Sequence, residues 1–292
     1  MRKLLAGFLL IASALVWSQA TTPGVHPITG RRYAGVMGYG GADWLVRPER
    51  EAEEHPEQAL DAIGIAKGAV VADVGAGAGY YTWRLAARVG PTGKVYANDI
   101  EPRMLDLLRR NMEQRHISNV ETVLGAVDDP KLPRGALDLI LLVDVYHEFS
   151  EPQKMLLHMR ESLKPEGRLV LLEYRAEDPK VPIRPEHKMT VAQAKAEVEP
   201  EGFRLARTLE ILPRQHILIF RLRSPAGGAR AAQSGTRTNM PPAGNCDSPC
   251  RYDCPNSLLA RSRISASLTS SRWLANSQIW PKGSSSFTVR SP

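Results

Sequence analysis

A run of glycines in residues 73–80, Asp-Val-Gly-Ala-Gly-Ala-Gly-Tyr, is the feature that most restricts how this chain can fold. It follows the apolar run 69–73, which has the length and composition of a buried parallel strand. It precedes residues 80–89, whose apolar side chains have helical spacing. Glycine adopts the backbone angles of a tight turn and lets a ligand approach the main chain closely. The segment therefore predicts a strand, a ligand-binding turn and a helix.

Strands and helices continue to alternate after this unit. Strands are expected at 94–99, 120–124, 137–143 and 168–174, and helices at 102–114, 151–163 and 189–199. Such repeats predict an α/β fold with a mostly parallel sheet and helices on both faces. The last two strands, 204–212 and 216–222, are joined by too few residues for a crossover helix, so they must be antiparallel.

Two further expectations concern the segments on either side of this pattern. Residues 47–60 are expected to form one helix ahead of the first strand, with Pro48 near its start. Arg214, Gln215 and His216 occupy the closing turn, which we expect to be structural and to lie at the sheet edge opposite the ligand.

The first twenty residues have the layout of a secretory signal peptide. Arg2 and Lys3 precede the apolar run 4–17, and small residues flank Gln19 at the expected cleavage site after Ala20. The run is shorter than the roughly 20 residues of a membrane span. We therefore predict an exported, periplasmic protein without a stable membrane span after signal removal. An uncleaved anchor, an unrelated apolar start, or a misassigned start codon that leaves the protein cytoplasmic are the alternatives.

The rest of the chain divides into three parts. Residues 21–54 are expected to form an N-terminal arm and the start of a helix, residues 55–223 the main domain, and residues 224–292 a disordered, low-complexity tail. The abrupt change in composition at the tail also fits a frameshifted or read-through end. All three cysteines, Cys246, Cys250 and Cys254, lie there, in a spacing that lacks a fourth metal ligand. The seven histidines are scattered, so the sequence predicts no metal site.

The net charge of +7 comes from the two ends of the chain. The leader carries two basic residues, and residues 224–292 carry eight basic and two acidic ones, which leaves 28 basic and 29 acidic residues in 21–223. A net charge of −1 does not provide the clustered basic face that attracts phosphate backbones. We therefore expect a small-molecule partner and no nucleic acid; the sequence does not indicate an oligomeric state.

An acidic residue, Asp99, ends the second strand twenty residues after Gly79. A carboxylate there can accept hydrogen bonds from both hydroxyls of a ribose, with Glu101 as the second choice. The alternative is that each acid caps the following helix. A dinucleotide fingerprint would place its third glycine where Tyr80 stands, so the pattern disfavours NAD.

Residues 70–105 resemble motif I and the following acidic motif of class I S-adenosylmethionine (SAM)-dependent methyltransferases, above all the group that includes small-molecule and quinone C-methyltransferases. Residues 163–170, Leu-Lys-Pro-Glu-Gly-Arg-Leu-Val, resemble the family's turn before the fifth strand. The resemblance covers about 55–222. It implies a Rossmann-like, seven-stranded sheet of order 3-2-1-4-5-7-6 with its last inserted strand antiparallel.

The resemblance also implies SAM as the cofactor and assigns residues to it. Asp73 would orient the cationic amino acid end, and Asp99 would hold the ribose. Asp128, in the turn after the third strand, is the candidate for the adenine amino group. The glycines of the turn would line the methionine and ribose portions of SAM, namely Gly75, Gly77 and Gly79.

The segment Asp144-Val-Tyr-His-Glu148 follows the fourth strand, at the edge where open α/β sheets bind their ligands. His147 could act as a general base, since its ordinary pKa is near neutrality. Glu148 could orient it or bind substrate, Tyr146 could touch the acceptor, and Asp144 could brace the SAM loop. Alternatively, His147 and Glu148 cap the next turn. His187 lies in a later loop, where a substrate lid is often found.

These features predict methyl transfer from SAM to a small molecule. Because SAM is made in the cytoplasm, an exported protein raises a second hypothesis: a non-catalytic binding protein that kept the nucleoside pocket. An NAD-dependent oxidoreductase is disfavoured by Tyr80 and by the lack of a recognisable hydride-transfer pair. An arsenite acceptor would require cysteines in residues 55–223, which has none.

Overall fold

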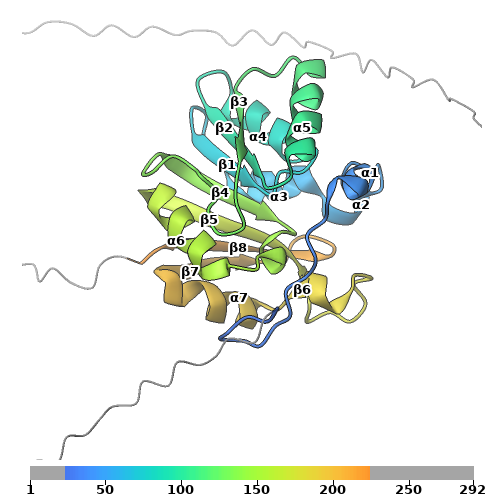
Figure 1. Cartoon of the computed structure of the whole chain (residues 1–292), viewed down its shortest axis with the longest axis vertical. Helices are drawn as coiled ribbons and strands as arrows, with labels where there is room; N and C mark the ends of the chain where they lie inside the picture. The colour runs from blue at the N-terminus through green and yellow to red at the C-terminus, as the bar shows by residue number, and fades with distance from the viewer. Residues whose placement is uncertain (1–23, 224–292) are drawn as a thin grey trace, which may run out of the picture. The chain divides into compact units, whose positions relative to one another are not determined.

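The structure, a computed structural model, describes residues 24–223 (Figure 1). The predicted signal peptide and the predicted tail with its three cysteines lie outside the described residues. Within residues 24–223, no helix combines the length and apolar character that crossing a bilayer requires.

One mixed sheet forms the centre of the domain. Its strand order is β3-β2-β1-β4-β5-β8-β7, and the two-residue strand β6 pairs with the end of β5. The predicted order 3-2-1-4-5-7-6 is confirmed. The short strand β6 was not predicted, so the predicted sixth and seventh strands are β7 and β8 in the structure. Strand β8 is antiparallel to both its neighbours, as expected. The strands are β1 (Val70–Val74), β2 (Lys94–Asp99), β3 (Val120–Leu124), β4 (Leu137–Val143), β5 (Leu163–Arg175), β6 (Lys188–Met189), β7 (Phe203–Leu209) and β8 (Gln215–Leu222).

Helices cover both faces of the sheet (Figure 1). Adjacent residues of a strand point to opposite faces, so Val71 packs on the side of α3 and α4 while Ala72 packs on the side of α6 and α7. Helix α5 packs on Ala97 through Leu108 and Met112. The helices are α3 (Pro56–Ile63), α4 (Thr82–Val89), α5 (Pro102–Gln114), α6 (Pro152–Ser162) and α7 (Val191–Val198).

The single helix expected at 47–60 is wrong, since the structure has two: α2 (Arg50–Glu54) and α3. The break is at His55, whose φ of 48° lies in the left-handed region. The residue before a proline is disfavoured in the right-handed helical conformation, and Pro56 follows. The break allows α2 to leave the axis of α3, and Arg50 and Glu54 of α2 line the cavity described below.

Hydrogen bonds hold the N-terminal arm, the described residues before α2, against the domain that contains the sheet. It contains a 3₁₀ turn, η1 (Tyr39–Gly41), and the short helix α1 (Ala42–Leu45). The guanidinium of Arg31 forms two hydrogen bonds with the buried carboxylate of Glu197 in α7, at 3.1 and 2.9 Å. Arg31 Nη1 and the Ala34 amide both donate to the carbonyl oxygen of His147, each at 3.0 Å. The arm therefore holds the backbone of a predicted site residue.

The closing hairpin lies at the ligand-binding edge of the sheet, so the expected placement at the opposite edge is wrong. Gln215, the first residue of β8, pairs with Tyr174 near the carboxyl end of β5. An antiparallel neighbour must begin where β5 ends. Gln215, which follows that turn, therefore reaches Asp144 in the cavity wall.

Candidate functional site

A cavity of about 650 Å³ opens at the carboxyl ends of β1, β2 and β4. The glycine turn, the 3₁₀ turn η2 (Tyr146–Glu148), the arm and the loop before β6 contribute to its wall. It is the kind of crevice in which open α/β sheets bind ligands. Seven predicted site residues line it: Asp73, Gly75, Gly77, Asp99, Asp144, His147 and Glu148.

The glycine turn and Asp99 meet in the cavity as predicted. The Gly77 amide donates to Asp99 Oδ2 and the Glu101 amide donates to Oδ1, both at 2.9 Å. Burial raises the pKa of Asp99, and these backbone donors oppose the shift. Gly75 and Gly77 line the cavity with φ of 71° and 52°, a region that favours glycine. Gly79 lies behind the turn, where a side chain would press on Leu108 and Met112 of α5.

Asp73 is buried at the end of β1, beside the cavity. The Thr82 hydroxyl donates to its Oδ2 at 2.6 Å. Burial raises the pKa of Asp73 to about 6, and the Thr82 hydroxyl and the Arg50 guanidinium oppose the shift. At neutral pH the group is thus ionised in a poorly hydrated place, which suits a cationic ligand group.

A charged cluster surrounds the same end of the cavity, and sequence reasoning had named only Asp144 among its members. Arg50 Nε donates to Glu54 Oε1 at 2.6 Å, and the Tyr174 hydroxyl donates to the same oxygen at 3.2 Å. Gln215 Nε2 donates to Asp144 Oδ2 at 2.7 Å. The members come from α2, β5, β8 and the residue that follows β4. Arg50 and Glu54 lie in a glutamate-rich helix start, and nothing in that pattern indicates a place in a binding site. Tyr174 did have a signal, because it lies near the end of a strand at the ligand-binding edge.

This cluster has polar atoms with no partner among the described residues. Four of them are Glu54 Oε2, Asp144 Oδ1, Tyr81 Oη and Gln215 Oε1. The pKa of Asp144 is well above its usual range because of burial and the nearby carboxylates of Glu54 and Glu173. Buried polar groups of a folded protein normally have a partner. Unpaired acceptors next to buried carboxylates fit the ammonium end of an amino acid ligand.

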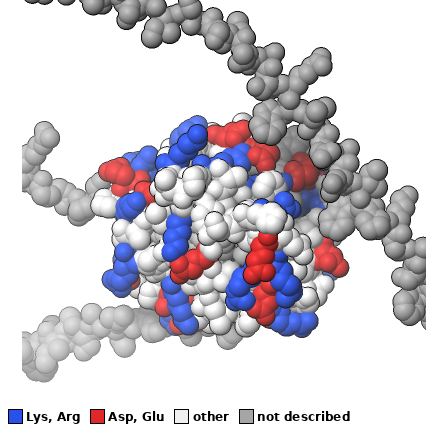
Figure 2. Space-filling model, turned by 90° about the horizontal axis from the view of Figure 1, so that it is seen from above, with Lys and Arg blue, Asp and Glu red and all other residues white. Residues whose placement is uncertain are grey.

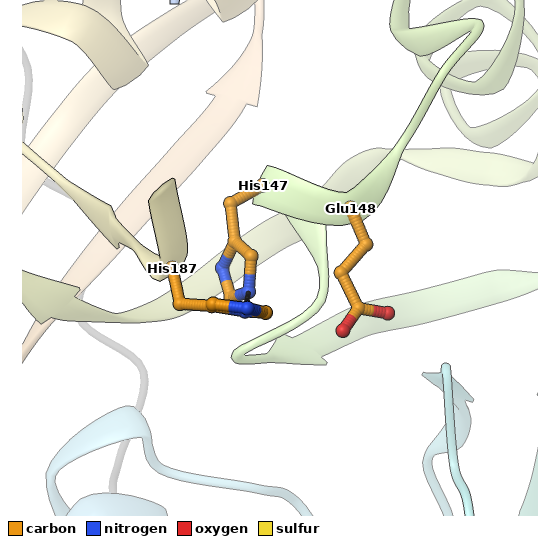
Figure 3. Close-up of side chains that lie close together, drawn as sticks. All are labelled: His147, Glu148 and His187. Atoms are coloured by element: carbon orange, nitrogen blue, oxygen red, sulfur yellow. Dashed lines mark hydrogen bonds between the residues drawn. The ribbon is translucent and has the colours of Figure 1, made fainter. Parts of the chain in front are cut away.

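At the other end of the cavity, two histidines, His147 and His187, come together with the carboxylate of Glu148 (Figure 3). His147 is 1% exposed; its Nδ1 lies 2.6 Å from Glu173 Oε2, and its Nε2 lies 3.1 Å from His187 Nδ1. Glu173 Oε1 accepts the Tyr146 amide at 2.9 Å. Glu148 lies beside the pair, and burial raises its pKa to about 7, opposed by His147. Burial lowers the pKa of His187.

Besides Gly79, two predicted site residues do not line the cavity. Tyr146 is fully buried in the core between the sheet and α6 and α7, with its ring edge-on to Phe149 at 5.7 Å. Its large apolar ring packs there, one residue before the chain turns His147 toward the cavity. Asp128 does not line the cavity: its carboxylate lies 3.7 Å from Lys154 Nζ, whereas the preceding Ala126 and Val127 form the wall.

Apolar side chains form much of the remaining wall. They come from three segments that line the same cavity: Val36 and Met37 of the arm, Phe149 after η2, and Ile183 of the loop before β6. At the mouth, the guanidinium of Arg47 stacks on the Trp44 ring at 3.7 Å. Trp44 itself lines the cavity, whereas the Tyr39 ring lies under the guanidinium of Arg103, 4.0 Å from its centre.

Comparisons with known proteins agree with this architecture. A family model described as a methyltransferase domain matches residues 65–210. A solved structure of a SAM-dependent methyltransferase from Aquifex aeolicus is 28% identical and has a TM-score of 0.61, covering 63% of this chain and 98% of its own.

Two curated proteins are also similar. A protein-L-isoaspartate O-methyltransferase from Methanothrix thermoacetophila is 31% identical over 111 residues, 38% of this chain and 50% of its own length. The ubiquinone/menaquinone biosynthesis C-methyltransferase UbiE of Escherichia fergusonii is 34% identical over 116 residues, 39% of this chain and 46% of its own. The chain thus spans about half the length of the curated relatives it matches. With the family model over half of its residues, the chain belongs to the class I SAM-dependent methyltransferases.

Proposed function

We propose that the chain transfers a methyl group from SAM to a small-molecule acceptor. The observation that carries the proposal is that one cavity joins two chemically different ends: the glycine turn with Asp99, and the pair His147 and His187 with Glu148. The first end suits a nucleoside, and the second supplies polar groups for a reacting atom.

The nucleoside end would hold the ribose through Asp99. Both oxygens of this carboxylate already accept backbone amides, which keeps the group aimed at one place. Each oxygen retains lone pairs for a ribose hydroxyl. Because the orienting amides belong to the protein, SAM would meet a preformed acceptor rather than order a mobile one.

The charged cluster suits the methionine end of the same ligand. The guanidinium of Arg50 could pair with the ligand's carboxylate. Asp73 and the free Oδ1 of Asp144 could accept from its ammonium. The excess of carboxylates over guanidinium groups here fits a ligand that carries both an ammonium and a sulfonium.

The chain's own part in the reaction is positioning. SAM supplies an electrophilic methyl group on a sulfonium that is its own leaving group. The protein residues must hold the acceptor in line with that methyl group and exclude water. The apolar wall of Val36, Met37, Phe149 and Ile183 would do so for a largely apolar acceptor. His147, the predicted base, has both nitrogens engaged, so it would act on the acceptor through His187.

Calorimetry of the purified chain tests the first half of the proposal. We expect SAM and its demethylated product, S-adenosylhomocysteine, to bind at one site, and NAD to show no binding. Asp99→Asn provides the loss-of-binding control. Equal affinity for NAD, or no heat with either adenosyl ligand, would contradict the proposal.

Turnover separates the enzyme from the non-catalytic alternative. We expect S-adenosylhomocysteine to accumulate when SAM is incubated with a mixture of hydroxylated aromatic and quinol compounds. His147→Ala should reduce this production while leaving SAM affinity unchanged. A chain that binds SAM tightly but produces none in a broad acceptor screen would be a binding protein.

Export also stays part of the proposal. A fusion of the chain to alkaline phosphatase, which needs periplasmic oxidation, would report it, with deletion of residues 1–20 as the control. The expected result is phosphatase activity that depends on the leader. Activity from neither fusion would place the enzyme beside the cytoplasmic SAM supply.

The charge distribution supports a small-molecule acceptor. Figure 2 shows lysine and arginine interspersed with aspartate and glutamate over one face of the described chain. That face has no continuous basic stripe of the kind that follows a phosphate backbone.

A further inference from the structure

The histidine pair and Glu148 have the arrangement of metal ligands. One ligand atom from each of His147, Glu148 and His187 can be chosen so that all lie within 4.8 Å of one another (Figure 3). Neighbouring ligands around a zinc-like ion are about 3 to 3.5 Å apart, given bonds of about 2.1 Å. The separation of 3.1 Å between His147 Nε2 and His187 Nδ1 lies in that range.

Glu173 prepares His147 for this role. Its buried carboxylate accepts from His147 Nδ1 at 2.6 Å and is itself fixed by the Tyr146 amide. A proton held on Nδ1 leaves the lone pair of Nε2 facing His187 and the cavity. Carboxylates that orient a ligating histidine in this way are the usual partners of metal-bound imidazoles. Glu173 is not itself one of the three candidate ligands.

The local charge also favours a cation. Glu148 and Glu173 lie beside the histidine pair. Glu186 and Arg184, in the loop that carries His187, are close enough to interact electrostatically with His187. The guanidinium of Arg31 also faces Glu173, but it is paired with a fourth carboxylate, Glu197. Four carboxylates against two guanidinium groups leave an excess of carboxylates. A divalent ion would offset it, whereas a water molecule would not.

We propose that His147 Nε2, His187 Nδ1 and the Glu148 carboxylate bind one divalent first-row transition metal ion. Two imidazoles and a carboxylate suit zinc, iron(II), cobalt or manganese better than magnesium or calcium, which prefer oxygen ligands alone. Three protein ligands leave at least one coordination position open, as in catalytic sites.

The site deepens the proposed function and rests on it. The three candidate ligands line the cavity, so an ion that they bound could also hold an oxygen of the methyl acceptor. A divalent ion lowers the pKa of a bound hydroxyl. The acceptor class is therefore a hydroxyl-bearing, largely apolar molecule such as a phenol or enol. Without a metal, the same residues form a hydrogen-bonded relay from Glu173 to His187.

Cobalt(II) is the probe for the test, since its visible absorption reports nitrogen and oxygen coordination. The full chain should be used with Cys246→Ser, Cys250→Ser and Cys254→Ser, so that tail thiols cannot contribute. After removal of bound metal with a chelator, we expect one cobalt ion per chain and competition by zinc. His187→Ala and Glu148→Gln should each weaken cobalt binding at least about tenfold.

His158→Ala is the matched control, because His158 is a partly exposed histidine of α6 whose neighbour is Glu161. It should bind cobalt as the parent does. SAM calorimetry on every variant shows that the cavity is folded. If the parent binds SAM but no cobalt, or if His187→Ala and Glu148→Gln bind cobalt like the parent, the metal site is overturned and the methyltransferase proposal stands. If the parent does not bind SAM, the proposed function itself fails.

Discussion

The two ends of the cavity are built in different ways. The nucleoside end comes from one turn, residues 73–79, and from Asp99 at the end of the adjacent strand, β2. The acceptor end combines η2, β5 and the loop before β6, held by an N-terminal arm through Arg31. A chemistry shared by a whole family can be encoded in one local motif. The part that decides the acceptor is assembled from segments far apart in the chain.

The largest expected effect tests how rigid the nucleoside end is. A Cβ at Gly75 would lie 2.5 Å from Val145 Cγ2, on a backbone with φ of 71°. Gly75→Ala should therefore lower the free energy of unfolding by about 2 to 4 kcal/mol and abolish detectable SAM binding. Urea unfolding and calorimetry measure the two effects.

Gly90→Ala is the matched control for Gly75→Ala. Gly90 has nearly the same φ, 70°, but no atom within 4 Å of the added Cβ. It should cost only about 1 to 2 kcal/mol of backbone strain and leave SAM affinity unchanged. Equal losses for the two variants would mean that the clash with Val145 is absent.

The next effect concerns Asp99. Asp99→Asn should weaken SAM binding about 100-fold, because hydrogen bonds to a charged group contribute about 1.5 to 3 kcal/mol. Glu101→Gln, which alters a carboxylate that caps α5, is the comparison. Calorimetry that found the larger loss for Glu101→Gln would move the ribose site to that residue.

A smaller effect is expected at the acceptor end. Glu173→Gln should lower kcat at least about tenfold, as changes to a residue that orients a catalytic group do, while the SAM dissociation constant stays the same. Glu166→Gln on the same strand, at the opposite edge of the sheet and exposed, should leave both unchanged. A parallel loss of SAM affinity in Glu173→Gln would show that the two ends are not separable.

The smallest effect is a pH dependence of SAM affinity. Asp73 has a pKa of about 6, with Arg50, Thr82 and Asp99 facing it. Its negative charge is present at pH 7.5 and is lost as the pH falls through 6. Affinity for a cationic ligand should therefore decrease by up to about tenfold between pH 7 and pH 5. Asp73→Asn should show lower affinity at pH 7.5 and a flatter profile; an unchanged profile would exclude Asp73 as the titrating group.

Several elements were predictable because their causes are local. Strands β2, β3 and β4 have the bounds predicted from their apolar runs. Helix α5 begins at Pro102 as expected, since proline has no amide to lose at a helix start. The break at His55 was missed, although the residue before a proline was a visible signal. The edge of the sheet at which the turn of the closing hairpin lies was predicted wrongly, because it depends on the antiparallel pairing of β8 with β5.

The site divides in the same way. Asp73, Gly75 and Asp99 could be assigned because their spacing along two adjacent strands places them together. His187 could not be joined to His147, since helix α6, strand β5 and a loop without a local structural pattern separate them in the sequence. Tyr146 was assigned from its place after the fourth strand and Asp128 from the family resemblance, and in both cases the neighbouring residues line the cavity instead.

By itself, the sequence determined the alternation of strands and helices, the glycine turn and the carboxylate at the end of the next strand, because each of these follows from a local pattern. The order of the strands in the sheet came from the resemblance to class I methyltransferases. Only the tertiary structure decided which side chains share the acceptor end. Burial of Glu173, the docking of the arm and the return of the chain through His187 depend on contacts between distant segments, and no local pattern specifies such contacts.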